Sequence, residues 1–253
     1  ELRQKSNGLE WLINHESGKS IGILNGIDAN VWNPATDPFL VQKYTNNITK
    51  YKASNKDFLT KRFNIYKELP IITFIGRLVK EKGADLIPDL VSAFLQSGQR
   101  AAFLVLGTGE GYLHDRFRAM THQFPGFFDA SIEYNETLAH RLYAGSDFLL
   151  MPSRVEPCGL NQMYALRYGT VPIVRKIGGL KDSIIDIGDP HGRGITFNNF
   201  TVDDALMACA RAVDIHQNET IFPKLLKRIM GVDFSWEKST EQYIQIYQQL
   251  TDS

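Results

Sequence analysis

Short runs of apolar residues, rich in β-branched and aromatic side chains, recur along the middle of the chain. The two clearest are Ile71–Ile75 and Ala102–Leu106, and weaker runs occupy residues 130–134, 148–151 and 171–174. Runs of this length and composition predict strands. Because the clearest runs are apolar almost throughout, they are typical of strands buried on both faces of a sheet.

Amphipathic stretches separate these runs and predict helices. After the first run, apolar residues fall on one helical face: Leu86, Leu90, Val91, Phe94 and Leu95. Alternating strands and helices predict an α/β fold, in which helices cover both faces of a parallel sheet. We therefore expect a Rossmann-like, doubly wound parallel sheet over about residues 68–215. Ligands of such a sheet bind at the carboxyl ends of its strands.

The two ends of the chain have a different pattern. Residues 21–24 predict a strand that enters a tight turn, and the polar residues 46–57 predict a segment that connects or covers the sheet. Residues 235–250 predict a helix that begins at Ser235. The apolar residues of this helix fall on one side: Tyr243, Ile246, Tyr247 and Leu250.

Composition and charge exclude several classes of protein. The chain has 28 Lys+Arg and 28 Asp+Glu, so its net charge is zero, which argues against bulk nucleic-acid binding. No run approaches the roughly 18 apolar residues of a membrane span. Two cysteines exclude a disulfide framework, and the first residues carry no apolar signal core, so we expect a cytoplasmic protein. A first residue of Glu rather than Met predicts a fragment or a processed chain.

Three loops that follow predicted strands carry candidate chemistry. In the first, residues 76–83, Arg77, Lys80 and Lys82 lie between a strand end and a helix start. The free amides of a helix start favour an anion, and with Arg77 and Lys82 they predict a site for a diphosphate. The alternative is a solvated basic loop. No Gly-Lys-Ser/Thr follows, so this is not a Walker A loop.

The second loop is the glycine-rich run Gly107–Gly111. A dinucleotide fingerprint would need a further glycine where Tyr112 stands, so we reject a nicotinamide site. We interpret the run as a turn close to a nucleotide. The alternative is a turn whose glycines serve backbone geometry alone.

The third loop, residues 152–161, places Glu156 before Pro157, where a helical backbone is disfavoured. Gly159 then precedes an apolar helix, so a carboxylate lies just ahead of amides that can receive phosphate oxygens. The alternative is a solvated glutamate. Cys158 has no histidine close in sequence to activate it, and we interpret it as structural. The histidines lack metal-ligand spacing and the chain has no Asp-x-Asp, so we expect neither a metal nor another cofactor.

Taken together, these loops resemble the C-terminal domain of bacterial-type glycogen and starch synthases, which are retaining GT-B glucosyltransferases. The matching segments are Gly22–Asp28, Trp32–Pro38, Gly76–Leu78, Lys82–Gly83, Ala144–Asp147, Met151–Arg154, Glu156–Leu160, Tyr164–Gly169, Gly178–Asp182 and Phe234–Trp236. The resemblance covers most of the chain, and the Glu-Pro-Cys-Gly-Leu run is its most specific part.

The resemblance implies a reaction and a set of site residues. Glucose would move from a nucleotide sugar, ADP-glucose rather than UDP-glucose, to the end of an α-1,4-glucan acceptor with retained configuration. Arg77 and Lys82 match the residues that hold the diphosphate, and Glu156 matches the carboxylate that binds the donor glucose; these three would be catalytic. The remaining donor-binding residues would be Gly76, Gly107, Thr108, Tyr134, which stacks on the base, and Cys158, Gly159, Leu160 and Asn161, whose amides would flank the sugar and phosphate.

The sequence departs from the wider pattern at two positions and lacks one domain. Related glycosyltransferases place a second glutamate where Tyr164 stands, a change that synthases of this class share, and Asn161 replaces an expected threonine. The family's N-terminal domain begins with a Lys-x-Gly-Gly-Leu motif, which Lys176–Leu180 resembles only superficially. We therefore expect half an enzyme whose N-terminal domain is missing, and which alone is inactive.

This interpretation divides the chain into three parts. Residues 1–36 would be an interdomain linker with a first strand, and residues 37–234 the Rossmann-like domain that binds the donor nucleotide. Residues 235–253 would be a helix that crosses toward the missing domain. The alternatives are a noncatalytic module that binds sugar nucleotides or glucan, and a sucrose or trehalose-phosphate synthase. The sequence leaves open the choice between ADP- and UDP-glucose, the oligomeric state and allosteric control.

Overall fold

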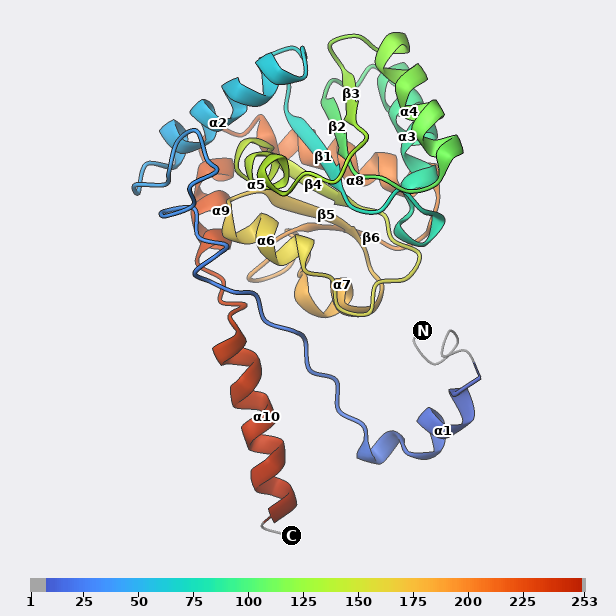
Figure 1. Cartoon of the computed structure of the whole chain (residues 1–253), viewed down its shortest axis with the longest axis vertical. Helices are drawn as coiled ribbons and strands as arrows, with labels where there is room; N and C mark the ends of the chain where they lie inside the picture. Colours follow the sequence, from blue (N-terminus) through green and yellow to red (C-terminus); the bar gives the residue numbers. More distant parts are fainter. Residues whose placement is uncertain (1–7, 252–253) are drawn as a thin grey trace.

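A six-stranded parallel sheet forms the centre of the computed structural model, which describes residues 8–251 (Figure 1). The strands are β1 (Ile71–Ile75), β2 (Ala102–Leu106), β3 (Phe128–Ser131), β4 (Phe148–Met151), β5 (Val171–Arg175) and β6 (Ile195–Phe197). Their order is β3-β2-β1-β4-β5-β6, and every neighbouring pair is parallel. This is the doubly wound order of Rossmann-like sheets, so the predicted fold class is confirmed.

Helices cover both faces of the sheet. One face carries α2 (Ile48–Arg62), α5 (Glu136–Gly145), α6 (Asn161–Arg167) and α9 (Ile221–Met230). The other carries α3 (Ile87–Gln96), α4 (Gly111–Gln123) and α8 (Val202–His216). The remaining helices are α1 (Glu10–His15), α7 (Gly178–Ser183) and α10 (Trp236–Thr251), with short 3₁₀ turns η2 (Ser17–Lys19), η3 (Lys80–Lys82) and η4 (Ala84–Leu86).

The central strands are apolar on both sides because each side packs on helices. Ile71 of β1 lies in one buried cluster with Leu59 of α2. Its neighbour Ile72 lies in the second buried cluster, together with Phe94 of α3 and Phe103 of β2. The rings of Phe94 and Phe103 meet edge to face, with centroids 5.3 Å apart. Alternate residues of one strand thus stabilise two helical layers.

Most strands lie where the apolar runs predict them. β1 and β2 match their predicted residues, and β4 and β5 agree within one residue. The third strand begins at Phe128, two residues before the predicted start, because the preceding Phe127 already bonds to β2 through its carbonyl. β6 has three residues only, too few to give a separate apolar run, and the sequence did not predict it.

One prediction for the first third of the chain is wrong. Residues 21–24 form no strand, because they pair with none of the six strands of the sheet. Residues 46–57, predicted to connect or cover the sheet, cover it as part of α2, which begins after Asn47, whose side chain accepts a bond from the Lys50 amide. Its helical signal is weak because the buried face includes the polar residues Lys52 and Asn55.

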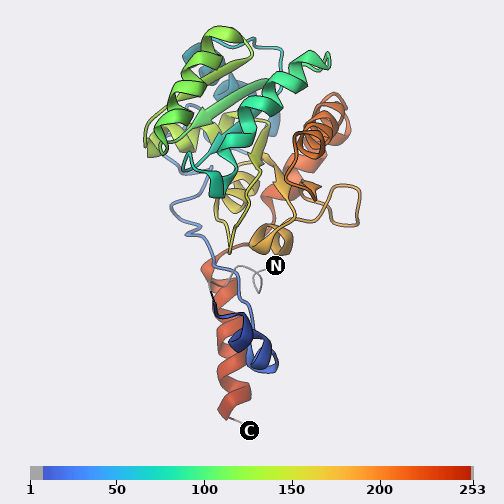
Figure 2. The ribbon, with the colours of Figure 1, turned by 90° about the vertical axis from the view of Figure 1, so that its right-hand side faces the viewer.

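Residues 8–36 form what we call the N-terminal segment. The first part of this segment and α10 project from the same side of the sheet domain (Figures 1 and 2). The helix predicted at residues 235–250 is present as α10. Its apolar side remains exposed at Tyr243, Tyr247 and Leu250. Between residues 8 and 251, no helix is both long and apolar enough to cross a membrane.

Candidate active site

The strand order reverses between β1 and β4, and the loops that follow these two strands meet there. In doubly wound sheets this switch point is where a crevice opens for a ligand. Gly83 has a left-handed backbone with φ of 74°. A Cβ added to it would lie 2.2 Å from the carbonyl oxygen of Pro152. Glycine at this position therefore allows the β1 loop to contact the β4 loop.

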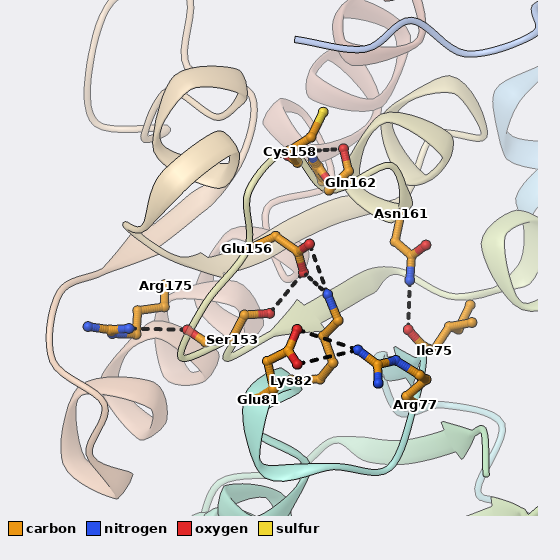
Figure 3. Close-up of polar contacts among 11 residues, drawn as sticks. Ile75, Arg77, Glu81, Lys82, Ser153, Glu156, Cys158, Asn161, Gln162 and Arg175 are labelled. Carbon is orange, nitrogen blue, oxygen red and sulfur yellow. Dashed lines mark hydrogen bonds and ion pairs between the residues drawn. The ribbon is translucent and has the colours of Figure 1, made fainter. Parts of the chain in front are cut away.

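Lys82 and Glu156 form an ion pair across these two loops (Figure 3). The Lys82 Nζ lies 2.9 Å from Oε1 and 2.8 Å from Oε2 of Glu156, and Ser153 Oγ donates to Oε2 over 3.2 Å. The side chains are 23% and 8% exposed. An ammonium group has three donor hydrogens, so Lys82 can hold this carboxylate and an anion at the same time.

The Gly-Gly-Leu segment, residues 178–180 at the start of α7, packs against residues 152–161, which we call the glutamate loop. The Gly179 amide donates to the Glu156 carbonyl over 3.0 Å. A Cβ on Gly178 would lie 2.1 Å from the same oxygen, and a Cβ on Gly179 would lie 2.1 Å from the carbonyl oxygen of Cys158. The two glycines are needed for this close approach, a role that the sequence analysis missed.

A cavity of about 320 Å³ opens beside the ion pair. We call it the phosphate-sugar cavity, after the parts of a donor that the sequence analysis expects at Lys82 and Glu156. Its lining is Phe74, Ile75, Gly76, Lys82, Met151, Ser153, Glu156, Gly159, Leu160 and Asn161. Asn161, the first residue of α6, donates its side-chain amide to the Ile75 carbonyl over 2.7 Å. This bond ties the start of α6 to the end of β1.

A second cavity, also about 320 Å³, adjoins the first and shares Ile75, Gly76 and Asn161 with it. We call it the nucleoside cavity, after the part of a donor that the sequence analysis expects at Tyr134. Its other lining residues are Trp32, Arg77, Leu106, Gly107, Thr108, Glu133, Tyr134, Asn135, Glu136, Ala139, Tyr143 and Tyr164. Aromatic and aliphatic walls with a few polar groups suit a flat, partly polar ligand.

The glycine-rich turn after β2 brings the β1 and β2 loops together. A Cβ on Gly107 would lie 1.9 Å from the Gly76 carbonyl oxygen, and one on Gly109 would lie 2.3 Å from that of Leu78. The Leu78 amide donates to the Thr108 carbonyl over 2.9 Å. Backbone geometry thus explains Gly107 and Gly109, whether or not a nucleotide lies close to this turn. Gly107 also lines the nucleoside cavity.

The structure distributes the predicted site residues over the two cavities. Gly76, Lys82, Glu156, Gly159, Leu160 and Asn161 line the phosphate-sugar cavity, whereas Arg77, Gly107, Thr108 and Tyr134 line the nucleoside cavity. Tyr134 is 84% exposed, so it lies at the rim. Arg77 pairs with Glu81 over 3.4 Å and not with Glu156, the partner of Lys82 (Figure 3).

Cys158 is the predicted site residue that lines neither cavity. Its sulfur accepts a bond from the Asn25 amide over 3.4 Å, and it lies apart from the Lys82–Glu156 pair (Figure 3). The loop bends at Gly159, where φ is 72°, so that residues on either side of the bend face different ways. The Cys158 side chain therefore contacts the N-terminal segment instead of the cleft.

Several lining residues were not predicted. Ser153 supports Glu156, and Glu133 and Glu136 place carboxylates at the nucleoside cavity. Trp32 comes from the N-terminal segment and stacks on Tyr164, and only the fold brings these two together. Among residues 8–251, no group of three or more histidines, cysteines or carboxylates is placed to hold a metal ion.

Comparison with known proteins assigns this cleft to a family. Residues 55–214 match the family model described as glycosyl transferases group 1. The chain is 44% identical over 249 residues to a glycogen synthase of Flavobacterium johnsoniae, a match that covers 98% of this chain and 52% of that protein. A glycogen synthase of Thioalkalivibrio sulfidiphilus is 39% identical, with the same coverage of both chains. The chain thus spans about half the length of these curated relatives.

Solved structures agree with this assignment. The catalytic domain of Starch Synthase IV from Arabidopsis thaliana, bound to ADP and acarbose, matches with a TM-score of 0.90 and 36% identity. The match covers 100% of this chain and 54% of that one. A sucrose-phosphate synthase from Thermosynechococcus elongatus has a TM-score of 0.64 at 16% identity, which shows a shared fold alone.

Proposed function

The chain belongs to the group 1 glycosyl transferases, and on that premise we propose that it is the donor-binding half of a glucan synthase. The whole enzyme would transfer glucose from a nucleotide sugar to the end of an α-1,4-glucan and retain the anomeric configuration. The similarity to glycogen synthases over nearly the whole chain supports this reaction.

The observation that carries the proposal is the Lys82–Glu156 pair at the switch point of the sheet. As the bond between the glucose C1 and the diphosphate breaks, negative charge grows on the leaving phosphate, the acceptor hydroxyl oxygen bonds to C1, and the hydroxyl proton passes to a phosphate oxygen. Lys82 and Arg77 line the cleft where this charge would develop. A cationic contact that strengthens as charge develops lowers the barrier to reaction.

Glu156 would bind the glucose. Its carboxylate is held by two bonds from Lys82 and one from Ser153, which fixes its orientation. Carboxylate oxygens have about four acceptor sites, so hydroxyl groups of the sugar can bond to those that the protein leaves open.

The nucleoside cavity would receive the base and ribose. Tyr134 lies at its rim and would stack on the base, with Gly107 and Thr108 nearby. We propose ADP-glucose as the donor, because the starch synthase that matches over this whole chain is bound to ADP. The donor would bind without a divalent metal.

The acceptor glucan and a second domain complete the proposal. The chain spans about half of its relatives, and α10 projects from the sheet domain with an exposed apolar side. We propose that residues 1–36 and α10 lead toward the domain that holds the acceptor. A cytoplasmic location remains a prediction.

Calorimetry tests the proposed donor. We expect ADP to bind the chain more tightly than UDP, with the same affinity in EDTA as without it. Tighter binding of UDP would contradict the choice of donor. Loss of affinity in EDTA would contradict metal-independent binding, and absence of any nucleotide binding would contradict the proposed function itself.

A further inference from the structure

Trp32 belongs to the N-terminal segment yet forms part of the nucleoside cavity. Its ring stacks on Tyr164 of α6, with centroids 3.7 Å apart and planes 17° apart. It also stacks on His140 of α5, at 4.1 Å and 10°. The ring is therefore fixed to two helices that cover the sheet, and a ligand in the cavity would contact it.

His140, on which Trp32 stacks, is held by hydrogen bonds in a buried polar cluster with Asp37 and Tyr168. The His140 Nδ1 lies 2.6 Å from Asp37 Oδ2, and the Tyr168 hydroxyl donates to the same oxygen over 2.5 Å. Burial, together with the bond to Asp37, raises the pKa of Tyr168, so this hydroxyl remains a donor. All three side chains are buried, which makes the stacking surface for Trp32 rigid.

The turn formed by residues 28–32 connects Trp32 to the place where the N-terminal segment meets the start of α10. The Trp32 amide donates to the Asp28 carbonyl over 2.9 Å. The Asp28 side chain accepts bonds from the amides of Asn30 and Val31 at 2.8 and 3.1 Å. A turn capped in this way is stiff, because its backbone bonds and its side-chain bonds support one conformation.

Residues 24–27 lie beside residues 234–239, and we call these two segments the crossing pair. The Ile27 amide donates to the Phe234 carbonyl over 2.8 Å, and Ser239 Oγ donates to the Leu24 carbonyl over 2.8 Å. A Cβ on Gly26 would lie 2.4 Å from the Cα of Trp236, the first residue of α10. The crossing pair thus joins the N-terminal segment to the base of α10.

We infer that Trp32 is a positioning residue that couples occupancy of the nucleoside cavity to the crossing pair. The inference rests on the proposed function, because it takes a nucleoside diphosphate as the ligand. A base or ribose against the Trp32 ring would hold it more firmly in its stacked position between Tyr164 and His140, and the capped turn would carry that restraint to Ile27 and α10. Donor binding would then shift the two segments that lead away from this domain toward one arrangement.

A second series of contacts also connects the cleft with the crossing pair. The Asn25 amide donates to Cys158 Sγ, and Cys158 is two residues from Glu156. The route through Cys158 does not involve Trp32. Replacing Trp32 by alanine therefore removes the contacts through the indole ring and leaves the contact through Cys158 in place.

Amide hydrogen exchange, measured by mass spectrometry with and without saturating ADP, tests the inference. In the wild-type chain we expect ADP to slow exchange severalfold in loop 76–83 and in both segments of the crossing pair. In Trp32→Ala, at ADP concentrations that calorimetry shows to be saturating, protection of loop 76–83 should persist and protection of the crossing pair should be lost. Trp32→Phe, which keeps a ring, should restore it.

Trp11→Ala is the matched control, because Trp11 is exposed on α1 and lines neither cavity. It should leave both protection patterns as in the wild type. A crossing pair that ADP does not protect in the wild type, or protects equally in Trp32→Ala, overturns the inference while the donor site stands. Absence of ADP binding by calorimetry would overturn the proposed function, and this inference with it.

Discussion

At the scale of single residues, Lys82 and Glu156 neutralise each other's charge and also line the cavity where a ligand would contact them. The pair keeps a half-buried cation and a buried carboxylate neutral as a unit. Such a pair is costly to break by removing one member, because the other charge is left without its partner. Each residue can still contact a ligand, because both line the phosphate-sugar cavity.

Replacement of Lys82 tests the cationic half of this pair. We expect Lys82→Ala to weaken ADP binding by about 1.5–3 kcal/mol, the usual range for a hydrogen bond to a charged group. Calorimetry gives the difference. Lys80→Ala is the control, because Lys80 lies in the same loop but lines neither cavity. Unchanged ADP affinity in Lys82→Ala would contradict the diphosphate assignment.

Asp147 stabilises the fold rather than the site. Its Oδ2 accepts bonds from the Ile71 amide and from Lys56 Nζ, both over 2.8 Å. Burial alone would raise the pKa of Asp147, but the charges of Lys56 and His216 outweigh burial and hold the pKa below its ordinary value. A carboxyl group with a lowered pKa in the folded state stabilises above its unfolded pKa. That stabilisation is lost as pH falls through the folded value.

The pH dependence of unfolding checks this role. We expect Asp147→Asn to lower the free energy of unfolding at neutral pH, and the gap to the wild type to narrow as pH falls below about 4, the pKa of an unfolded aspartate. Urea unfolding from pH 3 to 7 measures it. Asp115→Asn, at an exposed position of α4, should follow the wild-type curve. A gap that stays constant across this range would show that Asp147 acts in another way.

At the scale of elements, the site depends on glycines that let loops touch. We expect Gly179→Ala to displace the Glu156 loop, because the added Cβ would lie 2.1 Å from the Cys158 carbonyl oxygen. Overpacking of this kind costs about 1–3 kcal/mol of stability. Urea unfolding measures that loss, and calorimetry should show weaker ADP binding.

Gly111→Ala is the control for this substitution. A Cβ added to Gly111 would have no heavy atom within 4 Å, so stability and ADP affinity should stay close to those of the wild type. If Gly179→Ala behaved like Gly111→Ala, the Gly-Gly-Leu segment would not be the support of the glutamate loop.

Element by element, the sequence predicts what local pattern determines. β1 and β4 are mostly apolar runs, and the loops after parallel strands must lie at one edge of the sheet, so the position of Lys82 and Glu156 could be predicted. α2 could not be predicted, because its buried face includes Lys52. The Lys52 Nζ donates to the Ser146 carbonyl and to Thr170, partners that only the fold supplies. Burial lowers the pKa of Lys52 to about 7.

Contacts between distant segments were the other part that could not be predicted. Nothing near Trp32 in the sequence indicates that its ring stacks on Tyr164. Residues 21–24 have the composition of a strand, but a strand needs a partner, and the pattern of one segment does not say whether a partner lies beside it. The Cys158 side chain was interpreted as structural, but nothing in the sequence indicates that the bend at Gly159 turns it toward Asn25.

At the scale of the whole molecule, the sheet domain carries a complete core, and α10 extends from it (Figure 2). We expect this chain alone to fold and bind ADP but to elongate glycogen far more slowly than a full-length relative. Alignment of two reactants contributes about 7–11 kcal/mol to lowering a barrier, and the acceptor would be held by the other domain. Incorporation of radiolabelled glucose into glycogen measures both rates. Incorporation by this chain within about tenfold of the full-length rate, a difference of only 1.4 kcal/mol, would contradict the proposed division of labour.

A crystal structure of this chain with ADP would show whether the two adjoining cavities bind one nucleoside diphosphate. We expect the phosphates within hydrogen-bonding distance of Lys82 and Arg77, and the adenine in the nucleoside cavity beside Tyr134. ADP bound away from the β1 and β4 loops, at the amino ends of the strands for example, would contradict this expectation.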